Sequence, residues 1–580
     1  MANLDSWEAM AHSLKEEGTK YVFGLLGDQD FYNAIYHTPD IKSITVRHET
    51  SGAFMAYTIG RLTGEPAVCH GTIGPGTANM VPGILEAYTG CLPVLAINPG
   101  VPLRDQGKAA LQEADQVGMM EPVTKWSVRV NSPDKIFWVM RRAFNLAVNG
   151  KPGPIFIEIP RDIGKQKVDL EEYRKVERPI RFQGDPERIS RAVDLLLKAE
   201  RPVLVAGSGV ISSKAMNEFI ELAELLGIPC LTSPGGRGTI PEDHPLAMGL
   251  VGLYRTRLGK KVYKETDLLL SIGTRWETLQ SGNWEDYPPD AKFIQVDIEP
   301  FEIYRNWVAD VPIVGDAKLV LTQIITEVKR RIVQKDYKDM PRVKMLVQAM
   351  KEYETEIDEL IFSEQTKVKG AKIVRSLNKV FGKNTILVRE NGAADLWSDY
   401  CPYYKVLDVG DYVPVAEQTC MGIGVVGSIA AKLLKPDKNV VCTTGDGAFQ
   451  MFMKEMPTAV QYNAPVTWVV FDDSAFGWNK WAAQISTDWE VGKELGVNFD
   501  FNPDLVKTAE ANNCYGERIE RSGDIEQAFH NALKANSEGI PAVLDFATET
   551  GDYSYFFKER MLSKSLTPTQ VYGEPFPREI

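Results

Sequence analysis

The chain has 580 residues, of which 44% are hydrophobic and 25% charged, and its formal net charge is -13. This length is too great for one hydrophobic core and predicts three or four domains of a globular protein. The acidic balance argues against nucleic acid as the main partner, because binding to its backbone is driven by counterion release to basic side chains. The acidic balance is still compatible with a phosphorylated small molecule as a ligand, because such a ligand needs only a few local hydrogen-bond donors and a cation.

Cysteine usage and hydropathy favour a reducing compartment. The seven cysteines are scattered without a Cys-x-x-Cys pair, and the six histidines are equally dispersed, which argues against a zinc cluster. The first residues, MANLDSWEAMAHSLKEEG, predict an amphipathic helix without the pattern of a signal peptide. No stretch approaches the roughly 18 apolar residues of a membrane span, so we expect a cytoplasmic protein with no membrane partner.

In the first third of the chain, strand-like apolar runs alternate with stretches of helical periodicity. The predicted strands are YVFGLLG, SITVRH, PAVCHGTIGPG, LPVLAINPG and GPIFIEIP, and the predicted helices include ETSGAFMAYTIGRLTG and TANMVPGILEAYTG. This alternation is typical of an α/β domain with a parallel sheet. The charged segment from Val168 to Ile189 has the composition of a linker.

Two further units follow. RPVLVAGSGV, PCLTS, DLLLSIG and KFIQVDIEP predict the strands of a doubly wound middle domain, and the charged stretch 327–369 predicts helix leading across the molecule. The last third repeats the plan of the first, with strands at TILVREN, YYKVLDVG, NVVCTTGDG, VTWVVFDD and AVLDFATE. We therefore predict two similar α/β domains that flank a third.

The segment 445–473 carries the clearest chemistry. Gly-Asp-Gly at 445–447 follows a predicted strand, where open α/β sheets bind ligands and where glycines let the backbone approach a phosphate. Neighbouring parallel strands end at the same edge, so Asp446 can meet Asp473, which follows the next strand. Carboxylates with phosphate oxygens suit Mg²⁺. The alternative is an ordinary polar turn at each end.

This segment resembles the diphosphate signature of thiamine-diphosphate (ThDP) enzymes, Gly-Asp-Gly followed by an Asn-Asn pair. The resemblance implies that Asp446 and Asp473 are side-chain ligands of Mg²⁺ and that Ala475 offers its backbone carbonyl. The chain has Asp-Asp where the family usually has Asn-Asn, and the additional charge predicts a stronger dependence on metal. Asp472 is expected to be a bystander.

The segments CMGIGVVGSIAAKLL and ENGAADLW also resemble cofactor-holding stretches of this family. They imply that Val426 supports the bent cofactor from below, although an ordinary core valine would be equally buried, and that the 392–394 loop contacts the diphosphate. The implied cofactor-binding residues are Gly392, Ala393, Ala394, Gly424, Val426, Gly445, Asp446, Gly447, Ala448 and Asp473.

In the first domain, VRHETSGAFMAYTIGRLTG resembles the family's activating-glutamate stretch and implies that Glu49 protonates the aminopyrimidine. Without that resemblance, Glu49 is a carboxylate at a helix N-terminus, where the helix dipole favours it. GTIGPGTANMVPGILEAYTGCLPVLAI resembles a first-domain segment of acetohydroxyacid synthases and pyruvate oxidases. LQEADQVGMMEPVTKWS resembles a synthase segment and implies that Gln112 lies near the cofactor.

Asp28 is, with Glu49 and Gln112, a candidate catalytic residue, and four further positions are candidates for substrate contacts. Asp28 matches a pocket aspartate of simple pyruvate decarboxylases and is otherwise a turn residue, and Arg161 matches a synthase lysine and is otherwise part of an interdomain salt bridge. QEADQ replaces the adjacent histidines of those decarboxylases, which argues against plain decarboxylation to an aldehyde. Trp478, Asn479 and Trp481 fall where the family's substrate-selecting residues lie.

The resemblance covers most of the chain and implies three doubly wound parallel-sheet domains. They are a pyrimidine-binding domain over 1–170, a middle domain over 185–330 and a diphosphate- and Mg²⁺-binding domain over 370–550. The middle domain binds FAD in synthases and oxidases, ADP in oxalyl-CoA decarboxylases and nothing in other members. Residues 551–580 form a tail that closes over a site or packs on a neighbour.

Function follows from the same resemblance, which is to acetohydroxyacid (acetolactate) synthases, pyruvate oxidases, oxalyl-CoA decarboxylase and 2-hydroxyacyl-CoA lyase. We expect ThDP- and Mg²⁺-dependent decarboxylation of a small 2-oxo acid with transfer of the acyl carbanion. The alternatives are a lyase acting on a 2-hydroxyacyl-CoA or oxalyl-CoA, a cyclic dione hydrolase and, in another class, an inactive paralogue that binds or regulates. Family members form homodimers or homotetramers with active sites between subunits.

Overall fold

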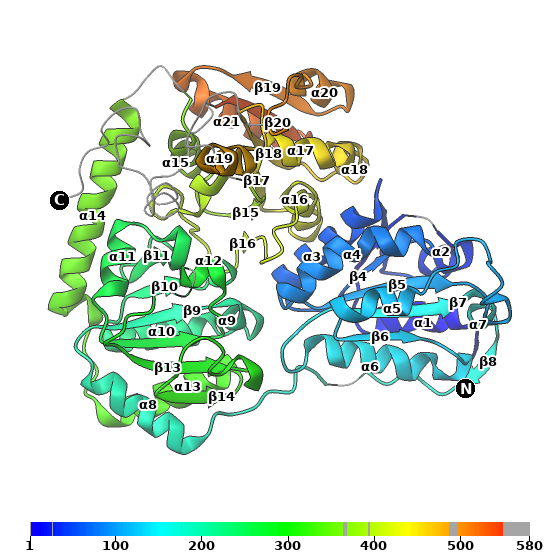
Figure 1. Ribbon diagram of the computed structural model, residues 1–580, viewed down its shortest axis with the longest axis horizontal. Coiled ribbons are helices and arrows are strands. Elements are labelled where there is room, and N and C mark those ends of the chain that lie inside the picture. The colour runs from blue at the N-terminus through cyan, green and yellow to red at the C-terminus, as the bar shows by residue number, and fades with distance from the viewer. Residues whose placement is uncertain are drawn as a thin grey trace.

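The computed structural model describes residues 2–25, 27–175, 177–282, 284, 286–363, 368–392, 395–486 and 496–548. These residues form three parallel six-stranded sheets, each packed between helices, and a small antiparallel pair, β1 (Ala2–Leu4) with β8 (Val168–Leu170) (Figure 1). The three α/β domains predicted from the sequence are confirmed. Among the described residues, no helix combines the length and the apolar character that crossing a membrane requires.

The N-terminal sheet has the strand order β3-β2-β4-β5-β7-β6. Its strands are β2 (Tyr21–Gly24), β3 (Lys42–Thr45), β4 (Ala67–His70), β5 (Val94–Gly100), β6 (Trp126–Arg129) and β7 (Ile155–Pro160). Its helices are α1 (Ser6–Glu16), α2 (Gln29–Tyr36), α3 (Glu49–Thr63), α4 (Pro75–Thr89), α5 (Gln116–Met120), α6 (Ile136–Val148) and α7 (Arg161–Gly164). The chain order reverses between β2 and β4, and such switch points are where open α/β sheets bind ligands.

The middle sheet has the order β11-β10-β9-β12-β13-β14, which is the arrangement of dinucleotide-binding folds. Its strands are β9 (Pro202–Ala206), β10 (Cys230–Thr232), β11 (Ala247–Leu250), β12 (Leu268–Ile272), β13 (Lys292–Asp297) and β14 (Val311–Val314). Its helices are α8 (Pro186–Lys198), α9 (Ser208–Ser212), α10 (Met216–Leu226), α11 (Arg257–Lys264), α12 (Thr278–Ser281) and α13 (Ala317–Arg331). The long helix α14 (Pro341–Ser363) then runs along the middle domain towards the C-terminal domain (Figure 1).

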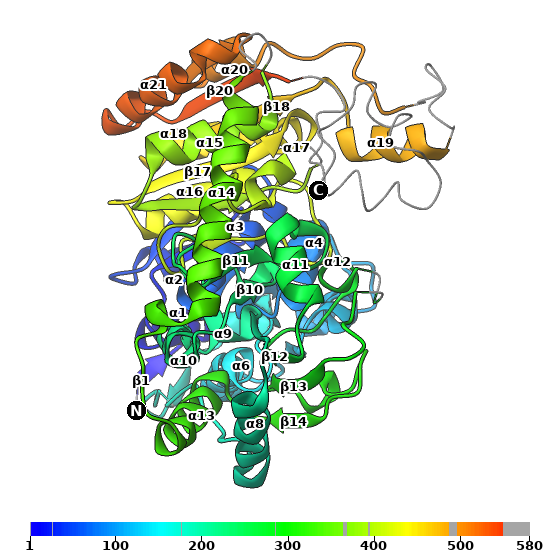
Figure 2. The same ribbon diagram turned by 90° about the vertical axis from the view of Figure 1, so that its left-hand side faces the viewer.

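The C-terminal sheet, β16-β15-β17-β18-β20-β19, repeats the strand order of the N-terminal sheet. The sequence predicts a shared plan for the two domains, but its expected strand YYKVLDVG is replaced by the short β16 that follows it. Its strands are β15 (Thr385–Arg389), β16 (Tyr412–Val413), β17 (Asn439–Gly445), β18 (Thr467–Asp472), β19 (Tyr515–Ile519) and β20 (Ala542–Ala547). Its helices are α15 (Gly370–Phe381), α16 (Ile423–Leu434), α17 (Asp446–Phe452), α18 (Met456–Gln461), α19 (Gly477–Ser486), α20 (Leu505–Ala511) and α21 (Ile525–Ser537). Seen from the side, α19 stands at the edge of this domain (Figure 2).

The N- and C-terminal domains pack through α3 and α16 around one continuous apolar core. The two helices approach closely because a methyl group at Gly427 would lie only 2.4 Å from Thr58 Oγ1, a distance that only glycine permits. The Tyr57 hydroxyl on α3 donates a hydrogen bond to the Pro414 carbonyl at 2.9 Å. This contact is made by helix faces, so the carboxyl edges of the two sheets remain outside it.

Candidate active site

The candidate metal site forms where β17 and β18 end side by side. Gly445 lies opposite Phe471 in the parallel register, so the chain leaves the sheet at Asp446 and Asp472 on the same edge. Asp446 is the first residue of α17 and is 1% exposed, and its Oδ1 accepts a hydrogen bond from the Gly447 N–H at 2.9 Å.

Burial and neighbouring carboxylates disfavour the ionisation of the aspartates at this edge. Burial, reinforced by the charge of Asp473, raises the pKa of Asp446 to about 8, although Asn502 Nδ2 donates to its Oδ2 at 3.0 Å. Burial also raises the pKa of Asp473 to about 6. A divalent cation offsets such repulsion because it stabilises both ionised forms. Within the described residues, no group of three or more His, Cys, Asp and Glu side chains could hold a metal.

Asp472 has a different environment from Asp473. Its Oδ1 accepts hydrogen bonds from Asn502 Nδ2 at 2.8 Å and from the Ser474 N–H at 3.1 Å, and its Oδ2 pairs with Arg518 Nη1 at 2.8 Å. Burial opposes ionisation, but the hydrogen bond and charge of Arg518 lower the pKa of Asp472. These contacts engage both oxygens of Asp472 within the protein, and its role as a bystander stays a prediction.

A cavity of about 490 Å³ opens beside the two aspartates, within the several hundred Å³ typical of cofactor sites. The sequence-assigned residues on its wall are Gly392, Gly445, Asp446, Gly447, Ala448, Asp473, Ala475, Trp478 and Asn479. The wall also contains Tyr254, Glu277, Thr278 and Leu279 from the middle domain and Arg389, Asn391, Glu417, Thr419 and Met421 from the C-terminal domain. The cavity therefore lies between two domains, at the switch point between β15 and β17.

Two assigned residues lie away from this wall. Val426 is fully buried on α16, in the core shared with α3, and Gly424 donates its N–H to Glu390 Oε2 at 2.8 Å. Met421, an apolar residue five positions before Val426, does line the cavity, and the sequence analysis missed it. The sequence feature that could have identified Met421 is its position directly before Gly422. Gly422 adopts a φ of 99° and ends the loop that leads into α16. Ala393, Ala394, the Trp481 side chain and the tail 551–580 lie outside the described residues.

Glu49 begins α3 at the carboxyl edge of the N-terminal sheet and is 4% exposed. Asn79 Nδ2 donates to its Oε2 at 3.0 Å. Two glycines leave room for the side chain, because a methyl group at Gly71 would lie 2.9 Å from Glu49 Cγ and one at Gly76 would lie 3.1 Å from Oε1. The fold therefore holds this carboxylate in one position at the sheet edge.

Asp28 and Arg161, which the sequence treats separately, form an ion pair inside the N-terminal domain. Arg161 Nε lies 2.7 Å from Asp28 Oδ2, and Arg161 Nη2 donates to the Gly27 carbonyl at 3.2 Å. Asp28 also caps α2 by accepting the backbone N–H groups of Asp30 and Phe31. The pair spans the ends of β2 and β7, while the Arg161 side chain remains 39% exposed.

Gln112 is exposed and packs its backbone carbonyl against Gly74, where a methyl group would lie 2.5 Å from the oxygen. The buried glutamine of this segment is Gln116, which accepts the Gly74 N–H and donates to the Pro99 carbonyl, both at 3.0 Å. No residue of the described N-terminal domain lines the 490 Å³ cavity of the same chain.

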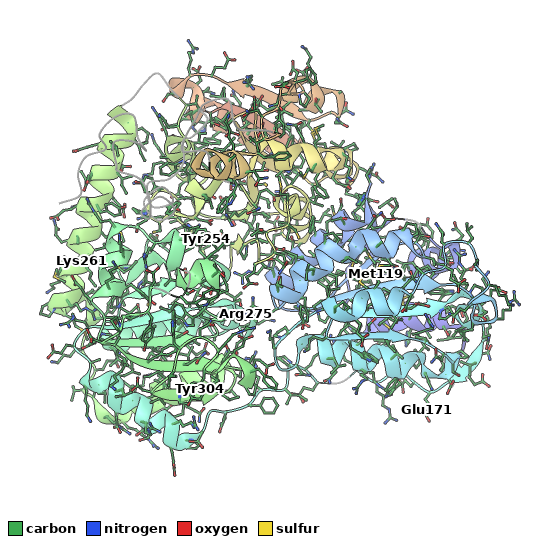
Figure 3. All side chains as sticks on the ribbon, viewed as in Figure 1. Met119, Glu171, Tyr254, Lys261, Arg275 and Tyr304 are labelled. Carbon is green, nitrogen blue, oxygen red and sulfur yellow. The ribbon has the colours of Figure 1, made fainter. Side chains whose placement is uncertain are left out.

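The middle domain has a smaller cavity, of about 80 Å³, at its own switch point between β9 and β12. Three ion pairs contribute to its wall: Lys151 with Glu302 at 2.8 Å, Arg181 with Asp316 at 2.9 Å, and Arg275 with Glu417. Burial raises the pKa of Asp297 on the same wall to about 6. Figure 3 labels Arg275 where the middle domain faces the other two, and Tyr254 nearer the C-terminal domain.

Three family descriptions match the chain in the order of its sheets. They are the N-terminal TPP binding domain of thiamine pyrophosphate enzymes over residues 5–119, the central domain over 189–324 and the C-terminal TPP binding domain over 391–546. The chain belongs to the thiamine pyrophosphate (ThDP) enzyme family.

Individual relatives narrow this class. A probable acetolactate synthase large subunit of Methanococcus aeolicus is 34% identical over 93% of this chain and 92% of that protein. A probable acetolactate synthase large subunit of Methanocaldococcus jannaschii is 34% identical over 94% of this chain and 92% of that protein. The acetolactate synthase large subunit of Buchnera aphidicola subsp. Schizaphis graminum is 30% identical over 96% of each chain. The chain is thus a ThDP-dependent enzyme related to acetolactate synthase.

Proposed function

We propose that this enzyme decarboxylates a small 2-oxo acid and transfers the resulting acyl carbanion to a second carbonyl compound, as acetolactate synthases do. The observation that carries the proposal is the cavity at the ends of β15 and β17, with Asp446, Asp473 and Ala475 on its wall. Relatives named acetolactate synthase over nearly the whole chain support the choice of reaction.

The residues present fit ThDP and Mg²⁺. Asp446 and Asp473 offer carboxylate oxygens and Ala475 a carbonyl to the metal, and Gly445 and Gly447 let the backbone approach the diphosphate. When bound, ThDP supplies a carbanion that adds to a carbonyl and then acts as an electron sink. Met421 supplies an apolar surface for the cofactor. In this proposal the protein holds, orients and desolvates the group.

Glu49 is proposed to transfer the proton to and from the aminopyrimidine. Because it lies at the carboxyl edge of the N-terminal sheet and off the cavity of its own chain, we infer that it serves the cavity of a second copy. The assembly is then a homodimer or homotetramer with each active site between two subunits. Gln112 lies on the same N-terminal edge and would reach the site in the same way.

Substrate selection is proposed to involve both sides of that interface. Trp478 and Asn479 line the cavity from α19, and Trp481 lies on the same helix. Asp28 holds the Arg161 guanidinium by its Nε, which leaves Nη1 directed away from that bond to meet the carboxylate of a 2-oxo acid.

The middle domain is proposed to hold a nucleotide, FAD or ADP, at the switch point between β9 and β12. The cavity there is small, about 80 Å³, and the ion pairs of Lys151 with Glu302 and of Arg181 with Asp316 lie on its wall. All seven cysteines are free thiols, which supports our proposal of a cytoplasmic enzyme.

The test is product analysis by mass spectrometry with Mg²⁺ and ThDP, offering pyruvate alone, pyruvate with a second 2-oxo acid, a 2-hydroxyacyl-CoA and a cyclic dione. We expect CO₂ and a condensed 2-hydroxy-3-oxo acid from the 2-oxo acids. Cleavage of the acyl-CoA or ring opening of the dione, with no condensation, would replace this proposal by a lyase or a hydrolase. The absorption spectrum of the same preparation distinguishes a bound flavin from ADP.

A further inference from the structure

A short segment carries much of the cavity wall. Residues 414–425, here called the wall segment, connect β16 to the first turn of α16. Three of its side chains, Glu417, Thr419 and Met421, line the 490 Å³ cavity. Several backbone N–H groups of this segment are bonded to side chains that lie outside it.

The C-terminal domain holds the end of the wall segment through one buried carboxylate. Glu390, directly after β15, is fully buried. Its Oε1 accepts the Gly422 N–H at 2.9 Å, and its Oε2 accepts the Gly424 N–H at 2.8 Å and the Val425 N–H at 3.3 Å. The start of α16 is therefore tied to the end of the neighbouring strand.

The N-terminal domain holds the beginning of the segment in the same manner. Glu86 on α4 is fully buried, and it accepts the Ala416 N–H through Oε1 at 2.5 Å and the Cys420 N–H through Oε2 at 3.3 Å. Burial outweighs these hydrogen bonds and raises the pKa of Glu86 to about 7. A carboxylate in such a place is costly unless both oxygens accept hydrogen bonds.

Two further contacts complete the attachment. The Tyr57 hydroxyl on α3 donates to the Pro414 carbonyl at 2.9 Å. Arg275 of the middle domain pairs with Glu417 and donates to the Thr89 carbonyl at the end of α4. All three domains thus converge on the wall segment.

We propose that Glu86 is a positioning residue for the cofactor: by holding the wall segment from the N-terminal domain, it keeps Met421 on the cavity and sets the affinity of the C-terminal domain for ThDP. The inference rests on the proposed function. When the binding-competent conformation is only a fraction of the population, the apparent dissociation constant rises by the inverse of that fraction. The interactions of Glu86 therefore act on cofactor affinity, and saturating cofactor restores the chemistry.

The test is the variant Glu86→Gln. Its amide group keeps the size of the side chain but faces one of the two backbone N–H groups with a donor. Isothermal titration with ThDP in excess Mg²⁺ should show a dissociation constant raised about tenfold, while kcat at saturating ThDP stays within about twofold. The milder variant Tyr57→Phe removes one hydrogen bond to the same segment and should raise the ThDP dissociation constant about fivefold.

The control is Glu17→Gln. Glu17 is also a buried glutamate of the N-terminal domain, bonded to Tyr173 and Arg178, and none of these partners belongs to the wall segment. The Glu17→Gln variant should have a lower melting temperature than the wild type and an unchanged ThDP dissociation constant. Unchanged ThDP affinity in Tyr57→Phe and in any folded Glu86→Gln protein overturns the positioning role while leaving the proposed function intact. Wild-type protein that binds no ThDP overturns both.

Discussion

At the scale of single residues, the two aspartates that close β18 are distinguished by their partners. Both oxygens of Asp472 accept hydrogen bonds from within the protein, and Arg518 supplies a compensating charge. Asp473 faces the cavity beside Asp446, and burial raises its pKa to about 6. Adjacent residues of the same type therefore have different environments, and we propose Asp473 as the metal ligand of the two.

The variant Asp473→Asn tests the role of the additional charge. The amide keeps an oxygen ligand but removes one negative charge, so the apparent affinity for Mg²⁺ should fall about tenfold while ThDP still binds at high Mg²⁺. Titration of activity with Mg²⁺ measures this. In the control, Asp472→Asn breaks the ion pair with Arg518 and should lower stability without shifting the Mg²⁺ titration. Equal shifts in the two variants would contradict the assignment.

At the scale of elements, the start of α16 decides that Met421 lines the cavity and Val426 does not. Gly422, with φ 99°, ends the loop, and Met421 before it faces the cavity. Val426, one turn into the helix, faces α3 in the core between the two domains. The apolar face of α16 packs against α3 and therefore contains Val426. The loop before α16 lies at the edge of the sheet and therefore places Met421 on the cavity.

Met421→Ala and Val426→Ala separate these environments. Met421→Ala should weaken ThDP binding about tenfold or more, because it removes apolar contact with the cofactor, and should change the melting temperature little. Val426→Ala should reduce the free energy of unfolding by about 2 kcal/mol and leave the ThDP dissociation constant unchanged. Calorimetry and cofactor titration on both variants measure the two effects. The opposite pattern would place the cofactor against Val426.

At the scale of the whole molecule, the two halves of the proposed site lie on different domains. The N- and C-terminal domains meet through α3 and α16, so Glu49 lies off the cavity that contains Asp446 in the same chain. The repeated strand order of the two sheets suits a second copy that places its N-terminal edge over that cavity.

Mixing two inactive variants tests this arrangement. Glu49→Gln and Asp446→Ala should each be inactive, the first because proton transfer is lost and the second because the metal site is lost. Co-refolded in equal amounts, they should recover about a quarter of wild-type activity, because half of the dimers are mixed and one of their two sites is intact. Recovery near zero, with mixed dimers present by native mass spectrometry, would contradict a site shared between subunits.

Much of the architecture could be predicted from sequence because its signals are local. Apolar runs ending in glycine mark strands that end at a ligand-binding edge, and the length of one strand–helix–strand unit brings Asp446 and Asp473 to the same edge. The ion pair of Asp28 with Arg161, in contrast, joins the loop after β2 to the end of β7, and the formed sheet brings these distant segments to the same edge.

The sequence by itself determined the three α/β domains, the ThDP family and part of the cavity wall, because backbone periodicity and short motifs specify strands, turns and phosphate-binding loops. Only the tertiary structure decided that Met421 and not Val426 faces the cavity, and that Glu86 holds the wall segment. Glu86 lies 330 residues from Ala416. Such a contact leaves no local pattern, because it depends on how two helices and a loop from different domains pack together.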